Sequence, residues 1–155
     1  MARVPESVTA FLSGRRFAVA GVSRDPGQAA NANYRKLLAS GYEVFPVNPA
    51  AAQVEGVTCY ADVRSVLVPL DGVVIATHRD VAIDVVRHAR ECGIGHVWFH
   101  RSFGPGSVSE AAVAGCRAAG MNCIVGGCPL MYCEPIDLFH RGMCWWLRRG
   151  GRVPG

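Results

Sequence analysis

The strongest constraint on the fold is a regular alternation of short apolar runs with helix-like segments. Each run is rich in Val, Ile, Ala or Phe, and the segments between runs carry apolar residues at helical spacing. Parallel strands need crossover helices and are buried on both faces. The order therefore predicts a single-domain, Rossmann-like α/β fold, a doubly wound parallel β-sheet of about five strands with helices on both faces. The predicted strands are Arg16–Ser23, Glu43–Asn48, Asp71–Thr77, His96–His100 and Asn122–Gly126.

The segments between these strands carry the start and stop signals of helices. Asp80 is the candidate N-cap of one helix, which has Val81, Val85 and Val86 on one face. Pro135 is expected near the first position of the last helix. The predicted helices are Pro5–Leu12, Ala30–Ser40, a short one within Ala61–Val66, Asp80–Cys92, Ser107–Ala119 and Pro135–Arg148.

Composition and charge narrow the class of protein. With 155 residues, 50% of them hydrophobic and 18% charged, the chain is expected to form one ordered domain over 1–150 with a loose tail over 151–155. The net charge of +4 comes from four arginines of the last fifteen residues, because the first 140 residues hold twelve basic and twelve acidic side chains. A nucleic-acid-binding protein would instead carry a basic face.

Cysteine usage and hydropathy indicate the cellular compartment in which the protein is expected. The seven cysteines form no C-x-x-C pair, and most lie in apolar runs, as buried free cysteines do. Arg3, Pro5 and Glu6 interrupt any signal peptide, and no apolar run approaches the ~20 residues of a membrane helix. We therefore expect a cytoplasmic protein without a membrane partner.

The ligand of an open α/β sheet lies beyond the carboxyl ends of the strands. In the loop that follows the first strand, Gly21 permits a tight turn, and the helix after this loop offers a site for a phosphate. Ser23 adds a hydroxyl and Arg24 a charge, although neither the G-x-G-x-x-G fingerprint nor the Walker loop is present. At the end of the second strand, Asn48 replaces the acid that usually holds the ribose of NAD.

Four motifs in the right order carry a resemblance to a known family. They are V-A-G-V-S at 19–23, G-Y-E-V-F-P-V-N-P at 41–49, L-D-G-V-V-I-A-T at 70–77 and G-G-C-P-L-M-Y-C-E-P-I-D at 126–137. With them the chain resembles the small CoA-binding proteins related to the N-terminal, CoA-binding domain of the succinyl-CoA synthetase α subunit. The synthetase's phosphohistidine domain has no counterpart here, so the resemblance does not imply the ligase reaction.

The resemblance implies where CoA would lie. The pyrophosphate would lie over Gly21, Val22 and Ser23. The nucleotide would approach two further segments, which are Val47, Asn48 and Pro49 in one and Ala76, Thr77 and His78 in the other.

Candidate catalytic groups are few. Cys128 lies in a loop at the expected binding edge, and His78 and His100 both end strands there. Cys128, Cys133, His140 and Cys144 could be drawn as a metal site, but their spacing is wider than in structural zinc sites, so no metal is expected. No complete catalytic set is identified, which favours a binding module over an enzyme.

Three functions remain open at this point. The first is binding of CoA, an acyl-CoA or another adenine nucleotide; the others are a small NAD(P)-dependent oxidoreductase and a regulatory or structural protein with an empty nucleotide pocket. Replacing Gly21 with Asp is expected to repel the pyrophosphate while the fold survives. The Trp145-Trp146 pair in the last helix makes a homodimer through that helix possible.

Overall fold

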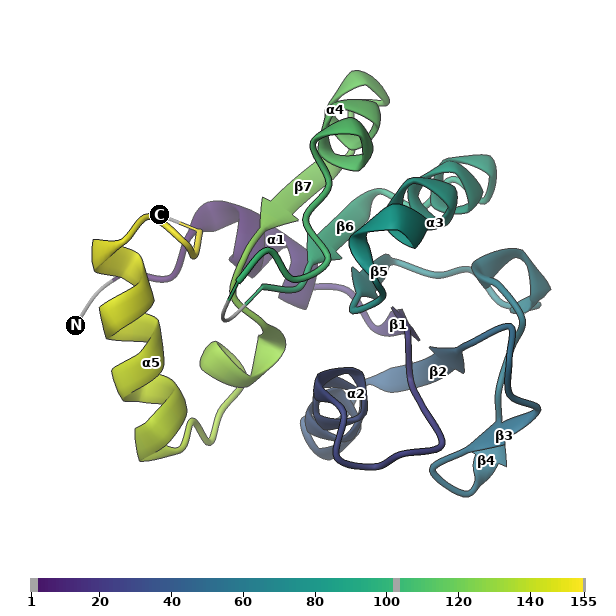
Figure 1. The fold of residues 1–155 in the computed structure, drawn as a ribbon, viewed down its shortest axis with the longest axis horizontal. Helices are drawn as coiled ribbons and strands as arrows, with labels where there is room; N and C mark the ends of the chain where they lie inside the picture. The colour runs from purple at the N-terminus through teal and green to yellow at the C-terminus, as the bar shows by residue number, and fades with distance from the viewer. Residues whose placement is uncertain (1–2, 102–103, 155) are drawn as a thin grey trace.

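The computed structural model describes residues 3–101 and 104–154 and has an open parallel sheet at its centre (Figure 1). The strand order is β2-β1-β5-β6-β7, and all neighbours in this sheet are parallel. The chain runs outward in both directions from the β1–β5 pair, which is therefore the switch point of the sheet. The predicted α/β class is confirmed. The strands are β1 (Arg16–Ala20), β2 (Glu43–Val47), β5 (Gly72–Ile75), β6 (His96–Phe99) and β7 (Asn122–Val125).

Helices cover both faces of the sheet. Alternate strand residues such as Val19, Val74 and Trp98 pack in a core with the first, second and last helices. Their neighbours Ala18 and Val73 pack in a second core with the other two helices. The helices are α1 (Glu6–Leu12), α2 (Ala29–Ala39), α3 (Arg79–Glu91), α4 (Glu110–Ala118) and α5 (Leu138–Arg149), with short 3-10 turns η1 (Val63–Ser65) and η2 (Pro129–Met131).

Pro46 is accommodated because β2 is an edge strand. The Glu43 N–H donates to the Arg15 carbonyl, on the side of β2 that faces β1. Main-chain groups alternate in direction along a strand, so those of Pro46 are directed to the outer edge of the sheet. There the Pro46 carbonyl accepts a hydrogen bond from the Tyr60 N–H at 2.9 Å. The proline is the last residue but one of β2, near the strand end.

Two helix starts differ from the sequence-based prediction. The N-cap of α3 is His78, whose Nδ1 accepts from the Asp80 N–H at 3.3 Å, so the expectation that Asp80 is the cap was wrong. Helix α5 begins at Leu138 with Asp137 as its N-cap, so Pro135 is not at the first helical position. In both cases a side chain that can accept from an N–H two or three residues on defines the start.

A small hairpin was missed by the sequence analysis. It joins β3 (Gln53–Val54) to β4 (Val57–Thr58), and the turn residues Glu55 and Gly56 both have positive φ, at 51° and 75°. Two such residues are typical of the tight turn that suits a twisted hairpin. In Figure 1 this hairpin lies beyond the β2 edge of the sheet.

Residues near the end of the chain contact the rest of the domain. The Arg152 N–H donates to the Leu147 carbonyl, and the side chain of Val153 is buried against Gly127. Within the described part of the chain, no helix is long and apolar enough to cross a bilayer.

Candidate functional site

The main cavity lies at the switch point, beyond the carboxyl ends of β1, β2 and β5. Its volume is about 630 Å³. The lining residues come from these strand ends, from the segment before η1 and from one face of α3. They are Ala20, Gly21, Ser23, Gln28, Val47, Asn48, Pro49, Ala61, Asp62, Val63, Ala76, Thr77, His78, Val81, Asp84, Val85 and His88.

Gly21 joins the ends of three strands. Its N–H donates to the Val47 carbonyl at 2.8 Å, and its φ is +103°. A Cβ at this position would lie 2.5 Å from the Ala76 carbonyl oxygen. Only glycine fits such a conformation and such a close approach. Gly21→Asp would therefore disturb the sheet, and the expectation that the fold would survive this change was wrong.

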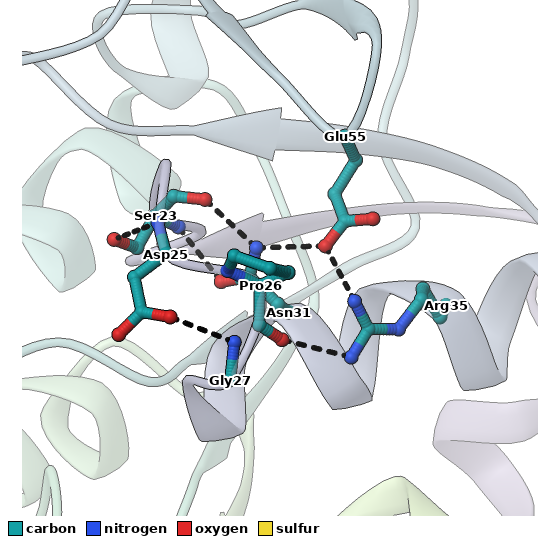
Figure 2. A network of polar contacts seen from close by, with 7 residues as sticks. All are labelled: Ser23, Asp25, Pro26, Gly27, Asn31, Arg35 and Glu55. Carbon is teal, nitrogen blue, oxygen red and sulfur yellow. Dashed lines mark hydrogen bonds and ion pairs between the residues drawn. The ribbon is translucent and has the colours of Figure 1, made fainter.

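The loop that follows Gly21 is held by a buried asparagine (Figure 2). The Asn31 side chain accepts from the Ser23 N–H and donates to the Ser23 carbonyl, both at 2.8 Å. It also donates to Glu55, which in turn forms an ion pair with Arg35 at 2.7 Å. A second Arg35 nitrogen donates to the Pro26 carbonyl. The missed β3–β4 hairpin thus supplies an acid that fixes the loop.

The same loop leads into the N-terminus of α2. Its N-cap, Gln28, makes no capping hydrogen bond with its side chain. The Gln28 carbonyl accepts from the Asn31 N–H at 3.1 Å, so the N–H groups of Ala29 and Ala30 are the ones left at the helix end. Asp25 turns its carboxylate to the Gln28 side chain and the Gly27 N–H, which lowers the pKa of Asp25. Gly21, Ser23 and the start of α2 form a positive helix end beside the cavity.

The cavity wall on the β2 side is made rigid by its own hydrogen bonds. Asn48 donates to the Val22 carbonyl at 2.9 Å and accepts from the Ala50 N–H at 2.9 Å, so its amide ties two loops together. Asp62 caps η1 and pairs with Arg64 at 2.9 Å, and this arginine lowers the pKa of the Asp62 carboxyl. The bonds of Asn48 use one of its two amide N–H groups, so the side chain is fixed in direction and keeps one N–H for a ligand.

Helix α3 supplies a wall of which the sequence analysis assigned only His78 to the site. His78, Val81, Val85 and His88 follow one another at helical spacing and line the cavity with Asp84. Val81 is 44% exposed, although its spacing had placed it on the buried face. The signal was present as the i, i+3, i+4, i+7 pattern, but this pattern alone does not distinguish a cavity wall from a core face.

The other candidate residues do not all gather at the cavity. Gly21, Ser23, Val47, Asn48, Pro49, Ala76, Thr77 and His78 line it, whereas Val22 is buried behind the loop and Arg24 is exposed outside the lining.

The three catalytic candidates, His78, His100 and Cys128, lie in different surroundings. His78 is exposed and caps α3, while His100 contacts Asn33 through its Nδ1 at 3.3 Å and burial lowers its pKa. Cys128 is 2% exposed. Only His78 lines the cavity. Among the residues described, no group of three or more His, Cys, Asp or Glu side chains is placed to hold a metal ion.

A switch-point cavity with a glycine turn and a helix N-terminus defines a nucleotide-binding α/β domain. The profile of the CoA binding domain family matches residues 15–134, which include every strand of the parallel sheet and the whole cavity lining. The chain belongs to this family of CoA-binding domains, which supports CoA binding in a general sense.

Solved structures share the fold. A conserved hypothetical protein from Pyrococcus furiosus is 33% identical over 70% of this chain and 90% of its own, with a TM-score of 0.62. A protein from Thermus thermophilus is 20% identical over 90% of this chain and 98% of its own, with a TM-score of 0.69, and shows the likeness of the fold alone.

A larger protein contains a similar domain. A dinucleotide-forming acetyl-coenzyme A synthetase from Candidatus Korarchaeum cryptofilum, in complex with phosphate and ADP, is 27% identical over 72% of this chain. The TM-score is 0.59, and the match spans only 25% of the synthetase chain. No curated protein matches this chain in sequence.

Proposed function

We propose that this protein binds CoA, or an acyl-CoA, in the cavity at the switch point. The observation that carries the proposal is the position of the cavity. It opens between the Gly21 turn, the end of β2 and the N-terminus of α3, within the part of the chain that matches the CoA-binding family.

The pyrophosphate is placed at the first loop. The Gly21 turn brings the main chain close to the cavity, and the first turn of α2 presents N–H groups and a positive dipole end. The N–H groups of Gly21 and Ser23 already donate to Val47 and Asn31, so the helix end is the main attraction for a phosphate. The exposed Arg24 lies in the same loop and can move toward a phosphate from the rim. Because Asn31 fixes Ser23 from behind, the loop needs little ordering when the ligand arrives.

The nucleoside is placed in the cavity itself. Val47 and Pro49 form one side, Ala76 and Thr77 the floor, and Val81 the α3 side. Apolar walls of this kind suit the faces of an adenine ring. Of the three candidate catalytic residues only His78 lines the cavity, and the neighbouring Thr77 hydroxyl donates to the His78 carbonyl, so binding is the function we propose.

Calorimetric titration of the reduced protein with CoA, and in parallel with NAD+, tests the proposal. Saturable binding of CoA is expected, with a dissociation constant in the micromolar range, about −8 kcal/mol. Silence from both ligands would reject the proposal and leave a protein with an empty nucleotide pocket. Tight binding of NAD+ instead of CoA would favour the oxidoreductase.

A matched pair of variants on α3 tests the placement. Val81 lines the cavity and is 44% exposed, whereas Ile83 on the same helix is 46% exposed and outside the lining. Val81→Trp fills the cavity, so the affinity for CoA should fall at least ~10-fold, about 1.4 kcal/mol. Ile83→Trp adds the same side chain elsewhere and should leave affinity unchanged. Equal affinities of the two variants would remove the ligand from this cavity.

A further inference from the structure

Helix α5 exposes an unusual amount of apolar surface. Leu138 is 84% exposed, Phe139 68%, Trp145 59% and Trp146 56%. The opposite face of the helix is buried through Met143, Cys144 and Leu147. Figure 1 shows α5 at one end of the molecule, and the helix lies after residue 134, outside the part that matches the CoA-binding family.

The outward face of α5 has the spacing of a helix-pairing seam. Leu138, Gly142, Trp145 and Arg149 are separated by four, three and four residues, which keeps them on one stripe of the helix. A hollow of about 380 Å³ lies beside Gly142, lined also by Leu138, Phe139, Met143 and Trp146. The Arg149 guanidinium lies 4.1 Å from the centre of the Trp145 ring and so holds that ring in place.

This seam is complementary to itself when the second helix runs in the opposite direction. We place the two-fold axis midway between residues 138 and 149 of α5. Gly142 then faces Trp145 of the second copy, and Leu138 faces its Arg149. A large side chain then fills the space over a glycine in both central layers. The aliphatic stem of Arg149 covers Leu138.

The arginines of α5 repel one another in this arrangement, but only weakly. The Arg149 residues of the two copies lie at opposite ends of the helix pair, about 16 Å apart along an α-helix with a rise of 1.5 Å per residue. This distance exceeds the Debye length of about 8 Å at physiological salt. Arg141 and Arg148 lie on a flank, where they meet the same arginines of the second copy at the solvent-exposed rim. Salt should therefore strengthen the association slightly.

The area is sufficient for a small specific dimer. Covering the exposed parts of the four apolar side chains removes roughly 500 Å² per copy from water, about 1,000 Å² in total, which is the lower limit for a biological interface. We propose that the protein forms a two-fold symmetric homodimer through α5, with the helices antiparallel and Trp145 of each copy seated against Gly142 of the other.

Sedimentation velocity of the full chain over roughly 1 µM to 1 mM tests the association. The wild type should approach twice 16.6 kDa as the concentration rises. Gly142→Leu fills the hollow, and a Cβ at Gly142 meets no atom within 4 Å, so the monomer is unharmed. The dimer dissociation constant of this variant should rise at least ~10-fold. Gly115→Leu on α4, where a Cβ also meets nothing, is the control.

A second pair of variants tests the antiparallel direction. Leu138→Glu and Leu138→Lys remove the same exposed apolar side chain, but only Glu is attracted to Arg149 of the second copy. The Glu variant should dimerise several-fold more tightly than the Lys variant, and added salt should reduce that difference. A wild type that remains monomeric at ~1 mM, or a Gly142→Leu variant that dimerises like the wild type, would overturn the proposal. Equal association of the two Leu138 variants would overturn the antiparallel register.

Discussion

At the residue scale, Asn31 is the side chain on which the first loop of the site depends. It is 1% exposed and makes hydrogen bonds with the Ser23 N–H, the Ser23 carbonyl and the Glu55 carboxylate. Asn31→Ala leaves these groups without a partner in a largely dry position, so the free energy of unfolding should fall by about 2–3 kcal/mol. Urea denaturation followed by circular dichroism measures the change.

Arg35→Gln is the comparison for that variant. It removes a half-exposed ion pair with Glu55 and the hydrogen bond to the Pro26 carbonyl, which together are expected to cost about 1 kcal/mol. A loss of stability for Arg35→Gln as large as that for Asn31→Ala would mean that the ion pair, and not the asparagine, holds the loop. The Asn31 variant should also bind CoA more weakly, because Ser23 is no longer fixed before binding.

At the scale of elements, Asp71 links the starts of two neighbouring strands. Its carboxylate accepts from the Arg15 N–H at 2.7 Å and the Arg16 N–H at 2.8 Å, just before β1 and β5 begin. These bonds hold the pKa of Asp71 below its ordinary value of 3.8. The stabilisation is therefore present above a pH of about 4 and is lost as the pH falls through the lowered pKa.

Asp71→Asn should lower the stability at neutral pH by about 1–2 kcal/mol, because a neutral amide oxygen accepts more weakly than a carboxylate. The difference between variant and wild type should shrink toward zero in acid, where the wild-type carboxyl is protonated. Denaturation midpoints at pH 7 and near pH 2–3 would measure this. A difference that is the same at both pH values would assign the effect to something other than charge.

The elements differ in how far the sequence predicts them. All strands of the parallel sheet are long enough to appear as apolar runs, and Gly21 and Gly41 mark real turns with positive φ. The β3–β4 hairpin has two residues per strand, which is too short for any periodicity. Its acidic residue, Glu55, accepts a hydrogen bond from Asn31, which lies 24 positions earlier in the sequence. Such a contact depends on tertiary packing and has no local signal.

The same limit applies to the site. The cavity residues at strand ends follow from the rule for parallel sheets, and the sequence therefore predicts Gly21, Asn48 and Thr77. The α3 wall, with Val81 and His88, requires knowledge of how the helix is rotated against the sheet. That rotation depends on how Ala82, Val86 and Ala89 pack in the core beneath the helix, which is a tertiary contact without a local signal.

At the scale of the whole molecule, the cavity proposed to bind CoA and the helix proposed to form the dimer are separated. The cavity lies over the ends of β2, β1 and β5. Helix α5 lies at the other end of the molecule and packs in the core that also contains residues of η2 and α1 (Figure 1). The family match covers the cavity and stops before α5. Ligand binding and self-association should therefore be separable by mutation, and neither Gly142→Leu nor the two Leu138 variants should alter the affinity for CoA.

Stability of the whole domain should also depend on the protonation of His100. Burial beneath α2 lowers the pKa of His100 below its ordinary value of 6.5, and its Nδ1 faces the Asn33 amide nitrogen. Between the lowered pKa and 6.5 the unfolded chain binds the extra proton, so this contribution is complete above about pH 6.5 and falls as the pH decreases. The slope should approach about 1.4 kcal/mol per pH unit. His100→Gln removes that slope, so the gap between the two stability curves should change between pH 7 and 5. Curves that stay parallel would mean that His100 does not titrate differently on folding.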